Sequence, residues 1–235
     1  MQKLKLKQKK EEKQEAKQKL SQKQRLALHA LQKQLNILQL REWLIIIGFI
    51  GGAALLRVPM QAAPNVEPIT FFALLAGWLF GKKKGFLTGA SAGYISNFFV
   101  FGGQGPWTIF QVLGWGLAGF LGGFLRKNSK TFEVVIIAAI ATLLFQLIVN
   151  TGWSFMLSKV FSISIFVSFL TALPFTLAQL ISNSIFALFL PKVRKMIYEK
   201  GQFNEKELCI ALISKLGGSP CFSWLNKFKK TAAEQ

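Results

Sequence analysis

The stretch Trp43-Leu-Ile-Ile-Ile-Gly-Phe-Ile-Gly-Gly-Ala-Ala-Leu-Leu-Arg-Val58 decides the fold class, because it contains a single charged side chain. It follows residues 1–41, which carry 12 Lys and Arg residues and 3 Glu residues. An apolar run beside a strongly basic segment is typical of a transmembrane helix whose basic flank lies in the cytoplasm. The sequence therefore predicts a first membrane segment at 43–58.

The remaining charges are segregated in the same way. Residues 192–235 hold 9 Lys and Arg residues and 4 Glu residues, whereas the 150 residues 42–191 hold 8 and 3. A central block with so few charges can form several spans of about 20 apolar residues each. The sequence thus predicts an all-α membrane protein of three parts: a basic cytoplasmic tail with an amphipathic helix at 1–41, a membrane domain at 42–191, and a second basic amphipathic tail at 192–235.

The central block contains six apolar segments, at 43–58, 69–80, 86–101, 107–125, 132–157 and 163–190. Every second connection is basic, namely 81–85, 126–130 and the exit at 192–195. The other connections carry one basic residue among them; they are 59–68, 102–106 and the turn around 158–159. Because basic connections tend to stay in the cytoplasm, this alternation predicts a six-transmembrane-helix bundle in the cell membrane, with N- and C-termini cytoplasmic.

The basic tails are expected to contact anionic lipid. Leucines between 26 and 38 recur mostly at gaps of three and four, the spacing of an amphipathic helix. Beside membrane spans, basic charge favours anionic lipid heads over nucleic acid, so no nucleic acid partner is expected. A partner-binding or RNA-binding arm at 1–40 is the alternative interpretation.

Several kinds of chemistry are excluded by what the sequence lacks. It has no Gly-x-x-x-x-Gly-Lys-Ser/Thr motif for ATP and no Asp, and its one histidine, His29, lies in the N-terminal tail. Cys209 and Cys221 show neither metal-ligand nor Cys-x-x-Cys spacing. No enzymatic activity, metal or cofactor is therefore expected, and a transporter of this kind would take its energy from partner subunits.

The two longer connections on the predicted outer side are stiff and unusual. The first, 57–68, contains three prolines, which fix the backbone and prevent a helix, together with Asn65 and Glu67. The second, 97–108, begins at Asn97 and contains a Gly-Gly-Gln-Gly-Pro-Trp run that allows close backbone approach to a ligand. Stiff connections with a few amides and aromatic rings are typical of a pocket for a small, partly polar molecule.

The spans supply further candidates for this pocket. Gln111 and Trp115 lie four residues apart on one helical face, one turn after Trp107, and Asn150 and Trp153 lie near the outer end of the fifth segment. Amides inside spans are costly without partners and mark a site or an interhelical contact. Two alternatives stay open: the tryptophans form an interfacial belt, and the deeper pair in the sixth segment, Gln179 and Asn183, joins helices.

Small residues are also patterned. Glycines four residues apart occur at Gly48 and Gly52, at 85, 89 and 93, and at 119 and 123. Such faces let helices approach closely, so most are expected to serve packing within the bundle. A face turned toward lipid would instead dock another membrane protein.

Together these residues resemble the substrate-binding S components of energy-coupling factor (ECF) transporters, and within them the cobalamin-type group. The resemblance is carried by Arg57, 64–70, Gly81, Gly85, 96–97, 103–108, Gln111 and 115–116, and it covers roughly residues 43–190. It implies a six-helix bundle that binds a vitamin or related nutrient from outside, docks on a transmembrane coupling subunit with a pair of ATPases, and releases its cargo inward. Such S components often carry an Ala-x-x-x-Ala face in the first helix, where this chain has Gly48 and Gly52.

The sequence therefore predicts the substrate-capture subunit of an ECF-type importer. The residues expected to bind the substrate are Arg57, Asn65, Glu67, Asn97, Trp107, Gln111, Trp115, Asn150 and Trp153, and those expected at the docking face are Gly48 and Gly52. Which vitamin-like molecule it binds is left open by the residues. The alternative is a membrane scaffold or lipid-surface protein that acts through its basic cytoplasmic tails.

Overall fold

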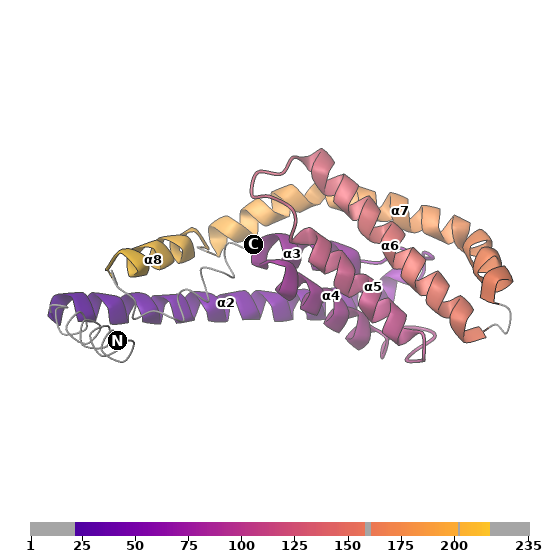
Figure 1. Ribbon diagram of the computed structural model, residues 1–235, viewed down its shortest axis with the longest axis horizontal. Coiled ribbons are helices and arrows are strands. Elements are labelled where there is room, and N and C mark those ends of the chain that lie inside the picture. Colours follow the sequence, from indigo (N-terminus) through magenta and orange to yellow (C-terminus); the bar gives the residue numbers. More distant parts are fainter. Residues whose placement is uncertain (1–21, 158–160, 202, 217–235) are drawn as a thin grey trace, which may run out of the picture. The chain divides into compact units, whose positions relative to one another are not determined.

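The computed structural model of the chain describes residues 22–157, 161–201 and 203–216. Those residues form seven helices and no strand: α2 Gln22–Met60, α3 Ile69–Phe80, α4 Lys82–Ser96, α5 Thr108–Gly122, α6 Thr131–Leu157, α7 Phe161–Lys200 and α8 Phe203–Leu216 (Figure 1). The all-α fold class is thereby confirmed. The outer parts of both predicted tails, 1–21 and 217–235, and the predicted turn at 158–159 lie outside the described residues.

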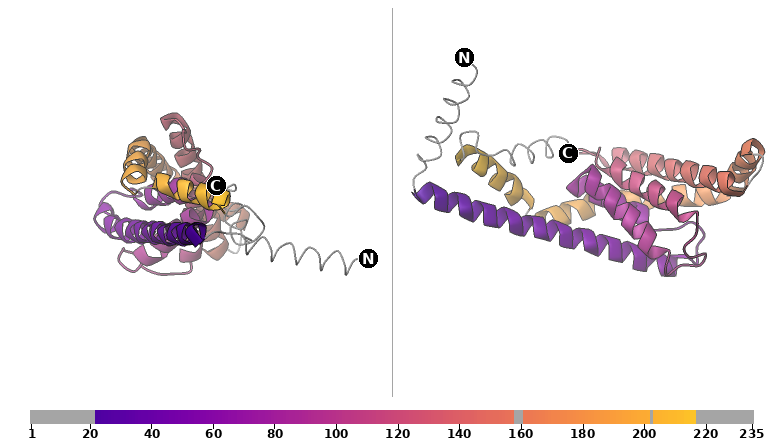
Figure 2. Two further views of the ribbon diagram at one scale, coloured as in Figure 1. Left: turned by 90° about the vertical axis from the view of Figure 1, so that its left-hand side faces the viewer. Right: turned by 60° about the horizontal axis from the view of Figure 1, so that its bottom comes forward.

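The chain divides into two compact units. The terminal unit consists of the described residues up to Arg41 and those from Tyr198 onward, and the central unit is Glu42–Ile197. In the terminal unit α8 lies beside the first half of α2, where Leu35 and Ile213 are fully buried against each other (Figure 2). Gln34 donates a hydrogen bond to Glu205 beside this contact (3.3 Å). The leucine face predicted from the spacing in α2 thus packs on α8 of the same unit.

Three short helices form the interior of the central unit. The helices α3, α4 and α5 lie side by side and pack on one another (Figure 1), with glycine backbones in direct contact. A Cβ atom added at Gly119 would lie 2.0 Å from the carbonyl oxygen of Gly85, and one added at Gly77 would lie 2.0 Å from that of Gly119. No side chain fits at these positions, so the glycine spacing sets how closely the three helices approach.

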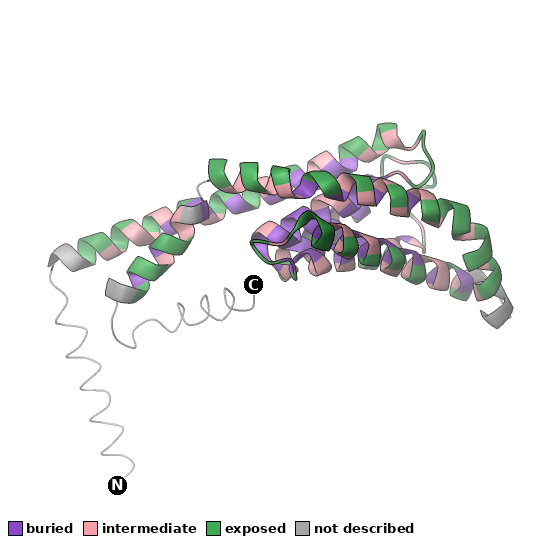
Figure 3. Ribbon diagram, turned by 90° about the horizontal axis from the view of Figure 1, so that it is seen from above, coloured by how far each residue is buried: buried purple, intermediate pink, exposed green. Residues whose placement is uncertain are grey.

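The longer helices carry the apolar surface. Three helices are long and apolar enough to cross a membrane: the described part of α2 from Arg25, α6, and α7 from Ile165. In the most apolar stretch of α7 only 6% of the residues are buried, and exposed residues run along the long helices (Figure 3). Apolar surface of this extent is expected to meet lipid or another protein rather than water.

Basic residues gather at one end of the central unit. Lys84 pairs with Glu42, and the Trp78 indole N–H donates to the carbonyl oxygen of Arg126 (2.8 Å). Arg194 donates to the carbonyl oxygen of Lys127 (3.0 Å), and its guanidinium lies 4.7 Å from the Trp78 ring centroid. The end of α3 with the start of α4 that follows it, the α5–α6 connection and the last part of α7 therefore lie together.

Candidate ligand-binding site

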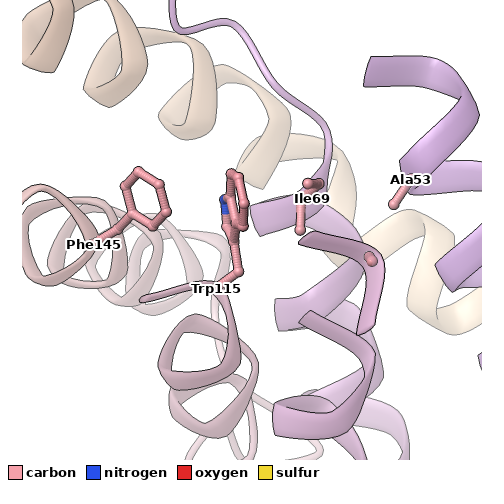
Figure 4. Packing of buried hydrophobic residues seen from close by; sticks show 5 residues of the cluster. Ala53, Ile69, Trp115 and Phe145 are labelled. Carbon is pink, nitrogen blue, oxygen red and sulfur yellow. The ribbon is translucent and has the colours of Figure 1, made fainter. Parts of the chain in front are cut away.

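At the end away from these basic residues, the central unit contains a cavity of about 550 Å³, within the usual size range of small-molecule sites. Its base is a cluster of buried apolar residues in which the Trp115 and Phe145 rings lie 4.8 Å apart between centroids (Figure 4). The lining comes from the end of α2, the α2–α3 and α4–α5 connections, α5, α6 and α7: Arg57, Gln61, Ala63, Pro64, Asn65, Val66, Glu67, Phe101, Gln111, Trp115, Phe145, Gln146, Val149, Asn150, Ala172, Phe175 and Gln179.

Glu67 is held by the start of α3. Its carboxylate accepts the backbone N–H groups of Ile69 (2.6 Å) and Thr70 (3.2 Å), which lie in the first turn and have no carbonyl partner within the helix. It also accepts the Thr70 hydroxyl (2.5 Å). A carboxylate at this position is favoured by the helix dipole as well as by these hydrogen bonds. The local sequence Glu67-Pro68-Ile69-Thr70 therefore explains how a buried acid is tolerated here.

A chain of amide side chains crosses from Glu67 to α6. Gln179 of α7 donates to the Glu67 carboxylate (3.3 Å) and accepts a hydrogen bond from Gln146 of α6 (2.5 Å). Asn150, one turn further along α6, donates to Gln146 (3.2 Å). Gln146 and Gln179 are buried, whereas Asn150 is half-buried at the cavity. The chain joins α3, α6 and α7 across one wall.

Arg57 forms a second polar group at the cavity. One of its terminal nitrogens donates to the Ser96 hydroxyl (2.6 Å) and to the side-chain oxygen of Asn97 (2.7 Å). Its guanidinium carbon lies 4.7 Å from the Trp115 ring centroid, a cation–π distance. Asn97 in turn donates to Gln111 (2.8 Å), so α2, α4 and α5 are tied together at this point.

The α2–α3 and α4–α5 connections are joined to each other as well. Gln61, just after α2, accepts the backbone N–H of Phe101 (2.7 Å) in the α4–α5 connection. Asn65 has a positive φ of 59°, which asparagine tolerates better than most residues. The two predicted loops thus contribute to the rim of one cavity.

Six of the nine predicted binding residues line this cavity: Arg57, Asn65, Glu67, Gln111, Trp115 and Asn150. Asn97 is buried behind the lining and positions Arg57 and Gln111. Trp107 and Trp153 are not among the lining residues; their rings pack on each other with centroids 5.7 Å apart.

Several lining residues were not among the predicted ones. Gln179 is the most informative, because its spacing with Asn183 also indicates an interhelical contact. Both residues do join helices, since Asn183 donates to Thr142 of α6 (2.9 Å) and Gln179 accepts from Gln146 of α6 (2.5 Å), but Gln179 also lines the cavity. Phe101, Phe145 and Phe175 carry no sequence signal that separates them from the other phenylalanines of the chain.

The predicted docking residues lie on the second half of α2. A Cβ atom added at Gly48 would meet no atom within 4 Å, and one at Gly52 would lie 3.8 Å from the Phe72 ring. Gly48 therefore faces open space in this unit. Among the described residues, no three His, Cys, Asp or Glu side chains come together as metal ligands.

One family model matches the chain, over residues 38–203; its description is "Family of unknown function (DUF6580)". No curated protein and no solved structure matches the chain.

Proposed function

The chain belongs to the DUF6580 family, whose function is unknown, and we propose that it is the substrate-capture subunit of an ECF-type importer. It binds a vitamin or related micronutrient from the outer side of the cell membrane. It then delivers this molecule inward together with a transmembrane coupling subunit and its pair of ATPases.

The cavity is the observation that carries the proposal. A mostly apolar hollow with a few oriented polar groups is the usual form of a small-molecule site. Here one arginine and several amides line it beside aromatic rings. Hydrogen bonds across helices join Arg57 to Asn97 and Asn97 to Gln111, and Asn150 is held by Gln146 one turn earlier in α6. Such restraint lowers the entropy cost of binding a ligand.

The proposal includes six crossings with both termini in the cytoplasm. It is supported by how the segments of the central unit connect its two ends. Glu42 contacts Lys84 at the basic end, and Arg57 at the end of α2 lies at the cavity. Glu67 begins α3 at the cavity and Trp78 ends it beside Arg126.

The later helices continue this alternation. Asn97 ends α4 beside Arg57, whereas the residues after α5 return to Trp78. Near the end of α6, Ser154 donates to Ser168 in the first part of α7 (2.8 Å). The chain then returns along α7 to the basic end, where Arg194 contacts Lys127. With basic connections at one end, the cavity end faces outward.

The need for partner subunits rests on the sequence, which contains no P-loop motif. The open surface around Gly48 supports docking of a coupling subunit, since glycines allow close helix approach.

The test is retention of a small molecule by the purified protein. Cells grown in rich medium express the wild type, Gln111→Ala and the control Gln104→Ala, and mass spectrometry measures what each purified protein retains. Gln104 is an exposed amide of the α4–α5 connection that is not among the lining residues. We expect the wild type and Gln104→Ala to retain the same molecule in equal amounts. Gln111→Ala should retain at least about tenfold less of it than the wild type. Equal retention by all three proteins, or none by the wild type, would contradict the proposal.

A further inference from the structure

We infer that the molecule bound in the cavity is a flat monocarboxylic acid, whose carboxylate pairs with Arg57. This inference rests on the proposed function, since it names the chemical class of ligand for the same cavity. It comes from the hydrogen-bond state of the two charged residues that line the cavity, Arg57 and Glu67.

The guanidinium of Arg57 is incompletely used by the protein. A guanidinium has five N–H donors in a rigid fork, and here one terminal nitrogen makes both hydrogen bonds, to Ser96 and Asn97. Both acceptors are neutral, and no carboxylate among the described residues forms an ion pair with Arg57. The other nitrogens therefore remain available in a half-buried position on the cavity wall.

Glu67 is in the opposite state. Its two oxygens accept four donors, namely the Ile69 and Thr70 amides, the Thr70 hydroxyl and the Gln179 amide. The residue is only 6% exposed. Its oxygens are thus already occupied by these four donors, and it has little capacity left to bind a cationic ligand. Glu67 is near enough to interact electrostatically with Arg57 but forms no ion pair with it, so Arg57 is the charge without a hydrogen-bonded counter-charge among the described residues.

A half-buried cation is stabilised most by an anion that accepts two parallel N–H bonds. A carboxylate fits better than a phosphate, because the cavity holds a single arginine and the nearby Glu67 would repel a second negative charge. The apolar part of the wall, including Phe145, Val149 and Phe175, provides surface for a ring. Aromatic walls favour offset stacking with planar molecules.

The experiment compares acids with their neutral isosteres. Naphthalene-2-carboxylate and naphthalene-2-carboxamide, and indole-3-acetate and indole-3-acetamide, are titrated at pH 7.5 into purified wild-type protein that has been freed of retained molecules. Ligand-observed NMR measures each dissociation constant. We expect each acid to bind at least about tenfold more tightly than its amide, as a charge-assisted pair implies.

Variants assign this preference to one residue. Arg57→Gln should bind acid and amide equally, Arg57→Lys should keep part of the preference because it retains charge but not the fork, and Lys83→Gln, an exposed lysine at the basic end, should behave like the wild type. The wild-type comparison stands even where a variant folds poorly.

Three results would overturn the inference. The first is that the wild type binds acids and amides equally or binds neither, and the second is an acid preference that survives Arg57→Gln. The third concerns the retained molecule. If the protein retains a neutral or cationic molecule that Gln111→Ala loses, the inference fails while the proposed capture function stands.

Discussion

The backbone of Gly93 lies directly beneath the indole of Trp115: a Cβ atom added at Gly93 would lie 2.3 Å from Cε3 of the ring. Gly93 belongs to α4 and Trp115 to α5, so the missing side chain lets the ring pack directly on the backbone of α4. The position of the ring matters because Arg57 and Phe145 both pack against it at the cavity.

Replacing Gly93 with alanine should therefore disturb the cavity. Trp115 has to shift, and overpacking of this kind costs about 1–3 kcal/mol of unfolding free energy. We expect Gly93→Ala to lower the midpoint of thermal unfolding in detergent and to weaken binding of any retained molecule. The matched control is Gly48→Ala, where a new Cβ meets no atom within 4 Å; its midpoint should stay the same or rise. Identical unfolding and binding of the two variants would show that the ring is not held in this way.

The Glu67 carboxylate should contribute to folding through α3. In Glu67→Gln, one acceptor oxygen becomes an N–H₂ donor that faces donors from Ile69, Thr70 or Gln179. Leaving buried polar groups unpaired costs about 1–3 kcal/mol, so we expect an unfolding free energy lower by that amount. The control is Glu133→Gln, an exposed acid in the first turn of α6, for which about 0.3–1 kcal/mol is expected. A loss at Glu67 no larger than at Glu133 would contradict the assignment.

The helix positions were largely predictable because local sequence signals mark where several helices begin and end. Pro68 precedes α3 and Gly81, with a φ of 91°, follows it, so the predicted segment 69–80 coincides with the helix. At α2 and α7 the signals mislead, because α2 continues through Pro59 to Met60 and α7 continues through Pro174 and Pro191 to Lys200, although proline usually ends a helix. The expectation that the prolines of 57–68 prevent a helix is therefore wrong at Pro59. Both helices are accordingly longer than the predicted segments at 43–58 and 163–190.

The lining of the cavity was predictable only where two lining residues lie on the same face of one helix. Gln111 and Trp115 share a helical face, and the spacing indicates this directly. Gln179 and Asn183 share that same spacing, yet one contacts Glu67 and the other Thr142. The difference depends on which helix lies opposite each residue, and a contact across 112 positions leaves no local trace in a single sequence.

Trp107 shows a second limit. Its place before α5 predicts a position near the pocket, but the ring folds back over Gly105, where an added Cβ would lie 2.4 Å from it. It then meets Trp153 rather than the cavity. The direction of a side chain at a helix start depends on the backbone of the preceding turn, which residue spacing does not report.

The Trp107–Trp153 pair should therefore act on stability more than on binding. Aromatic pairs contribute about 0.5–1.5 kcal/mol beyond the surface they bury, so a double-mutant cycle with Trp107→Leu and Trp153→Leu should give a coupling free energy of that size. Binding of the retained molecule should change less than in Gln111→Ala. Additive effects of the two substitutions, or a loss of binding as large as in Gln111→Ala, would place these rings at the ligand instead.

The proposed orientation can be tested with two exposed positions at opposite ends of the central unit. Ala62 lies in the α2–α3 connection near the cavity, and Asn128 lies in the basic α5–α6 connection. Each is changed to cysteine in a chain in which Cys209 and Cys221 are replaced by serine, and intact cells are treated with a membrane-impermeant maleimide. Because basic connections stay inside, Ala62→Cys should react in intact cells and Asn128→Cys only after permeabilisation. Reaction of both in intact cells would remove the six-crossing arrangement, since the two connections are separated by three predicted spans. The reverse pattern would keep the crossings but turn the cavity toward the cytoplasm, where it has no access to an external nutrient.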